Sequence, residues 1–152
     1  MKKVFCLILI TAMVLTLSSC LSIATAEVPE GAVAKYEFYQ EDAFMDSADF
    51  CYYVYESDAP FKDNKDYSKV RPEDFNNING YFKRFTSALF MSDRKDHFLF
   101  DSKYITEGDY WYLETAEGTT GTGGNIVYGK YDHFKLCYFD TESNILFFIH
   151  MS

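Results

Sequence analysis

The stretch IVYGKYDHFKLCYFDTESNILFFIHM, residues 126–151, contains two apolar and aromatic runs separated by a short polar break. Branched and aromatic residues are enriched in strands, whereas Asp, Ser and Asn favour turns. The stretch therefore predicts a β-hairpin, with strands over 126–139 and 145–151 and a loop over 140–144. Asn144 can adopt the positive φ that closes such a loop.

The apolar pattern of this hairpin also predicts a register. If Phe139 pairs with Ile145, then Leu136 lies opposite Phe148. Residues directly opposite each other in an antiparallel pair share a face of the sheet. This register would therefore place an apolar ladder on one face.

A helical period precedes the hairpin in the chain. Pro72 suits the first turn of a helix, and two acidic residues follow it, where the helix dipole favours negative charge. Apolar residues then recur at spacings of three and four, which places them on one helix face. We expect a helix over 72–90 whose buried face is formed by Phe75, Ile78, Phe82, Phe85 and Leu89.

The rest of the chain predicts strands and a surface loop. The polar residues 57–70 contain Pro60 and predict the loop. Aromatic residues make up 19% of the chain, which suits a sheet because rings pack well on a pleated surface. The sequence predicts an α+β domain, with one main helix on an antiparallel sheet of about five to six strands. Four further segments have the composition of strands: 33–39, 50–56, 97–100 and 109–115.

The chain is strongly acidic, with a formal net charge of -9 at pH 7. Such a surface repels phosphate backbones and anionic lipid headgroups. We therefore expect no nucleic-acid partner, and any attachment to a membrane would depend on a lipid. A basic protein partner would be favoured by charge.

The first residues have the three-part layout of a bacterial secretory signal. Lys2 and Lys3 precede an apolar run over 4–17, and small polar residues follow it. The apolar run is shorter than the roughly 20 residues that cross a bilayer, although a single-pass anchor is an alternative. The chain is thus expected to work outside the cytoplasm.

Leu17-Ser18-Ser19-Cys20 resembles the lipobox of bacterial lipoproteins, in which a branched apolar residue and two small residues precede the lipidated cysteine. The resemblance implies fatty acyl chains (palmitate or similar) on Cys20 and a location on a membrane surface of the cell envelope. The implied organisation is a signal peptide over 1–19, a lipidated tether over 20–32 and a single domain over 33–152. Cleavage after Ala26 is the alternative, and it would release a soluble secreted protein.

Two cysteines remain in the domain, Cys51 and Cys137, and each lies in a strand-like run. An even pair in an oxidising compartment can form a disulfide, here across neighbouring strands. The alternative is two buried thiols that pack as small hydrophobic side chains.

The sequence contains no motif that identifies a catalytic, cofactor or metal site. We expect no cofactor and no bound metal, because the histidines and cysteines lack metal-ligand spacing. The glycine-rich stretch 118–124 leads into a predicted strand and indicates a hairpin tip. Tyr110-Trp111-Tyr112 are expected to pack in the core, and the alternative is that alternation exposes one side of the trio and makes these residues a possible binding site.

We therefore expect a non-enzymatic binding or interaction lipoprotein, anchored in the envelope. An inhibitor or immunity protein against a basic enzyme is a second interpretation, because an acidic surface complements a basic one. An envelope hydrolase that uses carboxylates is the third interpretation.

Overall fold

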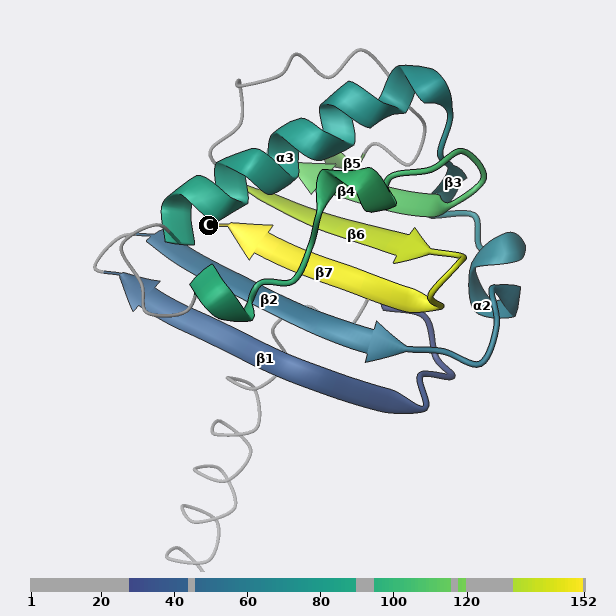
Figure 1. Cartoon of the computed structure of the whole chain (residues 1–152), viewed down its shortest axis with the longest axis horizontal. Helices are drawn as coiled ribbons and strands as arrows, with labels where there is room; N and C mark the ends of the chain where they lie inside the picture. The colour runs from purple at the N-terminus through teal and green to yellow at the C-terminus, as the bar shows by residue number, and fades with distance from the viewer. Residues whose placement is uncertain (1–27, 44–45, 90–94, 116–117, 120–132, 152) are drawn as a thin grey trace, which may run out of the picture.

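The computed structural model describes residues 28–43, 46–89, 95–115, 118–119 and 133–151. It contains a sheet with one long helix across a face (Figure 1). The elements in chain order are β1 (Ala34–Ala43), β2 (Asp46–Val54), α2 (Ala59–Lys62), β3 (Ser68–Lys69), the 3₁₀ turn η2 (Pro72–Asp74), α3 (Phe75–Ala88), η4 (Lys95–His97), η5 (Ser102–Tyr104), β4 (Tyr110–Thr115), β5 (Gly118–Thr119), β6 (Phe134–Asp140) and β7 (Ile145–Met151).

The strands form one antiparallel sheet in the order β1-β2-β7-β6-β4-β3, and the two-residue β5 also pairs with β4. The predicted fold class, α+β with one main helix on an antiparallel sheet, is confirmed. The predicted strand 126–139 begins at Phe134 as β6, and 126–132 lie outside the described residues. The predicted loop 57–70 contains α2 and β3.

The helix begins at Pro72, as predicted, with η2 leading directly into α3. The buried Asp74 carboxylate accepts hydrogen bonds from the Arg71 backbone N–H at 3.0 Å and from its Nε at 3.3 Å. These bonds fix the entry of the chain into the helix. The predicted apolar face is confirmed, since four of its five residues are buried and the fifth packs against the same core: Ile78, Phe82, Phe85, Leu89 and Phe75.

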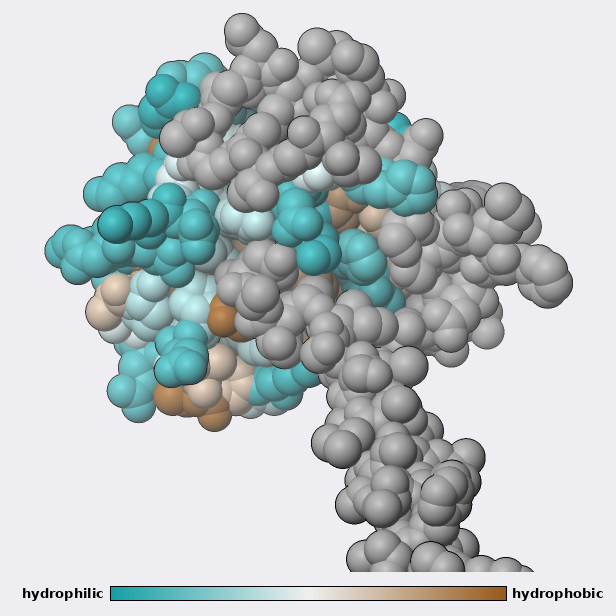
Figure 2. Space-filling model, turned by 180° about the vertical axis from the view of Figure 1, so that it is seen from behind, coloured by the Kyte–Doolittle hydropathy of each residue, from teal (hydrophilic) through white to brown (hydrophobic). Residues whose placement is uncertain are grey.

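Both faces of the central strands are buried, so the domain has two hydrophobic layers. On one face, α3 and the segment around Phe98 and Phe100 cover a cluster that includes Leu136 and Ile149. On the other face, Phe61 of α2 lies in a second cluster, and its ring stacks on Phe139 with centroids 3.9 Å apart. Figure 2 shows this second side, where much of the described surface is hydrophilic (teal).

The hairpin of β6 and β7 forms, but the predicted register is wrong by one residue. Phe139 pairs with Leu146 rather than with Ile145, which pairs with Asp140. An apolar ladder selects a register only where the opposite face is polar. Because β6 and β7 bury side chains on both faces, either register would satisfy the apolar pattern.

The turn of the hairpin decides its register instead. Asp140 belongs to β6, and its carboxylate accepts bonds from the Glu142 N–H at 2.9 Å and the Ser143 Oγ at 2.7 Å. Asn144 has a φ of 56°, the left-handed conformation expected for it. The loop is therefore four residues long, 141–144, rather than five.

The predicted strand 97–100 is wrong: His97 ends η4, and residues 98–100 belong to no strand. Residues 97–106 instead cross the face of the sheet beside α3, and we call them the strap (Figure 1). The Tyr52 hydroxyl accepts a bond from the Leu99 N–H at 2.8 Å and donates to the His97 carbonyl at 3.3 Å. A side chain of β2 thus supplies the partners that a neighbouring strand would have supplied.

The last residues of the predicted tether lie against the domain. The Tyr55 hydroxyl donates to the Pro29 carbonyl at 2.7 Å, and Val28 packs on the second hydrophobic cluster. Residues 28 and 29 therefore already contact the folded domain, although the sequence placed them in the tether before residue 33.

One buried carboxylate joins the strap, β6 and the hairpin turn. Asp109 is fully buried and accepts bonds from the N–H and Oγ1 of Thr106 at 3.1 and 2.8 Å, and from the same groups of Thr141 at 2.9 and 2.6 Å. The Tyr138 hydroxyl also bonds to it and lies 2.7 Å from the Tyr104 carbonyl. Burial, followed by the bond to Asp109, raises the pKa of Tyr138, so its hydroxyl keeps its proton.

We predict that Asp109→Ala destabilises the domain by about 2 kcal/mol or more, because it removes the acceptor of the buried Tyr138 hydroxyl and of the donors of Thr106 and Thr141, and a buried donor without a partner costs about 1–3 kcal/mol. The measurement is urea unfolding followed by the fluorescence of Trp111. Glu73→Ala is the control, because this exposed carboxylate makes only a surface ion pair with Arg71 and its loss should leave the midpoint nearly unchanged. Equal midpoints for the two variants would contradict the role of Asp109.

Candidate functional site

An apolar groove of about 350 Å³ lies between the strap and the first strands of the sheet. Its lining comes from β1, β2 and β7, from the strap, and from the hairpin turn with the end of β6. This volume is within the range of small-molecule sites. The lining residues are Tyr36, Tyr52, Val54, Leu99, Tyr104, Asp140, Ser143, Ile145 and Phe147.

Exposed apolar side chains gather at this groove. Among the described residues outside 37–47, four large hydrophobic side chains are exposed, and three of them line the groove: Tyr36 at 58%, Leu99 at 66% and Tyr104 at 37%. The fourth, Val33, is not part of the lining. Single exposed apolar residues are ordinary on protein surfaces, whereas contiguous ones mark binding sites.

The floor of the groove is held rigid by aromatic contacts. The Phe147 ring meets the Tyr52 ring edge to face at 5.3 Å and lies parallel to the Tyr104 ring at 6.4 Å. The strap wall is fixed by the hydroxyls of Tyr52 and Tyr138, which bond to strap backbone groups. The groove is therefore formed before any ligand arrives.

A carboxylate, that of Asp140, is part of the lining of the groove. Asp140 is only 5% exposed, and its oxygens accept bonds from the turn, including one from the lining residue Ser143. The groove thus has an apolar body and one polar, negatively charged end. Together with the net charge of -9, this end favours a neutral or cationic ligand over an anionic one.

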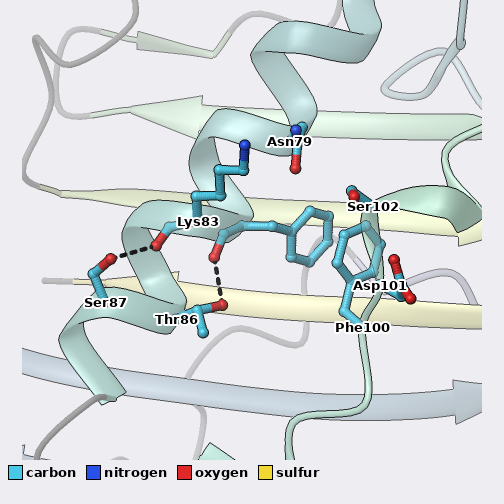
Figure 3. A pocket seen from close by; sticks show the side chains of 8 residues that line it. Asn79, Lys83, Thr86, Ser87, Phe100, Asp101 and Ser102 are labelled. Carbon is cyan, nitrogen blue, oxygen red and sulfur yellow. Dashed lines mark hydrogen bonds between the residues drawn. The ribbon is translucent and has the colours of Figure 1, made fainter.

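A second hollow, of about 590 Å³, lies on the other side of the strap, against α3. In Figure 3, Asn79 and Lys83 lie on the helix side of the hollow, and Phe100, Asp101 and Ser102 lie on the strap side. The remaining lining residues include Thr86 and Ser87, whose hydroxyls donate to helix carbonyls at 2.7 and 2.8 Å. Since these hydroxyls already bond to the helix, this hollow offers fewer groups to a ligand than its size suggests.

Core packing of the trio Tyr110-Trp111-Tyr112 is confirmed, and the alternative of an exposed binding side is wrong. All three are buried, at 3%, 2% and 5% exposure. Trp111 belongs to the cluster beneath α3, and the two tyrosines belong to the cluster on the opposite face. Alternation sends these side chains to opposite faces as expected, but both faces are covered, so none of the three rings is presented to a ligand.

The expected disulfide is not formed: Cys51 and Cys137 are both fully buried thiols. The sequence suggested neighbouring strands, but the structure places β7 between them, and Phe148 pairs with each cysteine from its own side. Two strand spacings are about 9.5 Å, beyond the roughly 4.4–6.8 Å between the Cα atoms of a disulfide. Burial raises the pKa of the Cys51 thiol, which keeps it protonated.

Other expectations fall partly outside the described residues. These include lipidation of Cys20, the cleavage positions and residues 120–124 of the glycine-rich stretch, whose residues 118–119 form β5. Among the described residues, no group of three His, Cys, Asp or Glu could hold a metal ion. None of the helices in the described ranges is long and apolar enough to cross a membrane.

Sequence reasoning missed the groove, although one signal was present. Leu99 lies between Phe98 and Phe100, which pack inward, so alternation directs Leu99 outward as an exposed apolar side chain. Tyr104 follows five residues later on the same strap, whereas Tyr36 on the sheet side of the groove lies 63 residues before Leu99. Only the path of the strap brings the three residues together.

Comparison with known proteins places this chain in no group: no family model, curated protein or solved structure matches it.

We predict that neither cysteine reacts with a thiol reagent in the folded protein, and that both react after denaturation without a reductant. A soluble form beginning at Glu27 suits this test, because it contains every described element and no other cysteine. Mass spectrometry after alkylation with iodoacetamide would count the adducts. Finding no adduct in the denatured, unreduced chain would show a bridge and contradict the buried thiols.

Proposed function

We propose that this chain is a ligand-binding lipoprotein of the bacterial cell envelope, and that the groove beside the strap is its binding site. The first part of the proposal is supported by the resemblance of Leu17-Ser18-Ser19-Cys20 to the lipobox. The second part is supported by the three exposed apolar side chains that line one groove. That clustering is the observation on which the binding function depends.

The chemistry of the groove suggests the class of ligand. Aromatic and branched side chains from the sheet and the strap form its body, and Asp140 is part of its lining. A ligand with an aromatic or branched apolar body would remove Leu99 from water, and an amine or other donor on the ligand would face Asp140. Burying one such side chain contributes about 1.5–3 kcal/mol, so each lining residue has a measurable effect on affinity.

The anchor would place this groove at a membrane surface. Two or more acyl chains on Cys20 hold a protein stably, whereas one chain binds only marginally. The acidic surface does not favour anionic lipid headgroups, so attachment is expected to depend on the acyl chains.

We predict that N-phenyl-1-naphthylamine, a neutral aromatic amine, binds the groove with a saturable rise in fluorescence. Leu99→Ser should weaken this binding about tenfold, because the serine removes the apolar contact of one lining residue. Val33→Ser is the matched control, since Val33 is a similarly exposed apolar residue outside the groove. The anionic analogue 1-anilinonaphthalene-8-sulfonate should bind more weakly than the neutral probe.

Equal affinity of the Leu99→Ser protein, the Val33→Ser protein and the unchanged protein for the neutral probe would overturn the groove as the site. Probe fluorescence that does not saturate would do the same.

We also predict that cells growing with an alkyne-bearing palmitate analogue label the protein, and that Cys20→Ala abolishes the label. The expected reason is that Cys20 becomes the acylated amino terminus of the mature chain. Gel fluorescence after click conjugation and sequencing of the amino terminus would measure both results. An unlabelled mature chain that begins at Glu27 would show instead a soluble secreted protein.

A further inference from the structure

A row of four titratable side chains crosses the sheet at the end opposite the hairpin turn. The register pairs Asp49 of β2 with His150 of β7, His150 with Lys135 of β6, and Lys135 with Glu114 of β4. Residues directly opposite each other share a face, with Cβ atoms roughly 4.5–5.5 Å apart. The four side chains therefore form one continuous row on the face that carries Cys51.

The charges of this row follow a definite order. His150 Nδ1 lies 2.9 Å from Asp49 Oδ2, and Lys135 Nζ lies 3.6 Å from Glu114 Oε2. The two carboxylates thus occupy the outer strands of the row, and the two basic groups are neighbours on its middle strands. Like charges directly opposite each other repel.

A hollow of about 150 Å³ opens at the basic middle of this row. Its lining includes His150, Lys135 and Glu114 of the row, and also His133, which lies two residues before Lys135. Three basic side chains and one acidic side chain, that of Glu114, therefore border one small hollow in a chain whose net charge is -9. With protonated imidazoles, the hollow would be locally positive, whereas the chain as a whole is negative.

Asp49 gives the row a fixed geometry. Its side chain is 1% exposed, so the imidazole of His150 bonds to a carboxylate held in the interior. Because Nδ1 is occupied by Asp49, Nε2 is the ring nitrogen that His150 can offer to a ligand. The charged groups of the described residues in this row are those already named, on β2, β4, β6 and β7.

We propose that this hollow binds a small oxyanion, a carboxylate or phosphate group, between His150 Nε2, Lys135 Nζ and His133. An anion there would offset the repulsion between His150 and Lys135 that remains after each has paired with its own carboxylate, Asp49 and Glu114. A protonated imidazole and an ammonium group make charge-assisted hydrogen bonds to oxyanions. This site is separate from the groove, so the two proposals stand or fall independently.

The test is a titration of the mature protein, purified in nonionic detergent with its histidine rings labelled with ¹³C, followed by nuclear magnetic resonance. Acetate and inorganic phosphate are added separately. The ring signals of His133 and His150 should shift saturably, and those of His97 on the strap should not.

Variants separate a bound oxyanion from a general salt effect. Lys135→Met should weaken binding about tenfold, because it removes a charge-assisted bond while keeping the aliphatic stem. Lys103→Met is the matched control, since Lys103 is an exposed lysine that pairs with Asp101 far from the hollow in sequence. Asp49→Asn should weaken binding and also make the His150 signal broader or displaced in the absence of any anion.

Saturation by acetate alone identifies a carboxylate site, and saturation by phosphate alone identifies a phosphate site. Either result supports the proposal. Shifts that do not saturate, that are equal at His97, or that are unchanged in folded Lys135→Met would overturn it.

Discussion

The fold depends on one buried carboxylate. Asp109 stands just before β4, where the strap ends, and its two oxygens bond to the strap at Thr106 and to the hairpin turn at Thr141. Its backbone carbonyl also accepts the Val70 N–H at 2.7 Å, which holds the edge next to β3. Asp109 therefore joins the end of the strap to the hairpin turn through its side chain, and to the segment of β3 through its backbone carbonyl. An unpartnered charge in this position would be very costly, so the segments must assemble together.

The same assembly produces the groove. Tyr138 bonds to Asp109 and to the Tyr104 carbonyl, and Tyr52 holds the strap at Leu99. The strap is thus fastened to the sheet by polar contacts at both ends, while its apolar residues between them are divided between the core and the groove. The proposed binding function uses a surface that the interior polar contacts keep open. The proposed oxyanion site uses the far end of the same sheet, where the charged row replaces the apolar layers.

Much of the architecture could be predicted from the sequence, because the long helix and the hairpin have strong periodic patterns. The apolar face of α3 and the positive φ of Asn144 follow from local chemistry alone. The strap could not be predicted, since Phe98 and Phe100 alternate like strand residues and only the Tyr52 hydroxyl replaces a neighbouring strand. The expectations of a disulfide and of an exposed side of the trio were wrong for the same reason. The alternation of side chains along a strand does not show which strands are neighbours or whether one or both faces of the sheet are covered. The groove depends on contacts between distant residues, which no local pattern contains.

The two-sided burial of β6 and β7 has a consequence for how the chain reaches its native state. A hairpin displaced by one residue would exchange the faces of one strand and still bury nearly the same apolar area. Hydrophobic collapse therefore does not distinguish the two registers. The displaced hairpin remains a competing compact state of similar free energy of apolar burial. The discrimination comes from the carboxylates of Asp140 and Asp109, which find their partners in only one of them. In this domain, polar contacts at one end of the sheet select the strand register that burial of the apolar side chains alone does not determine.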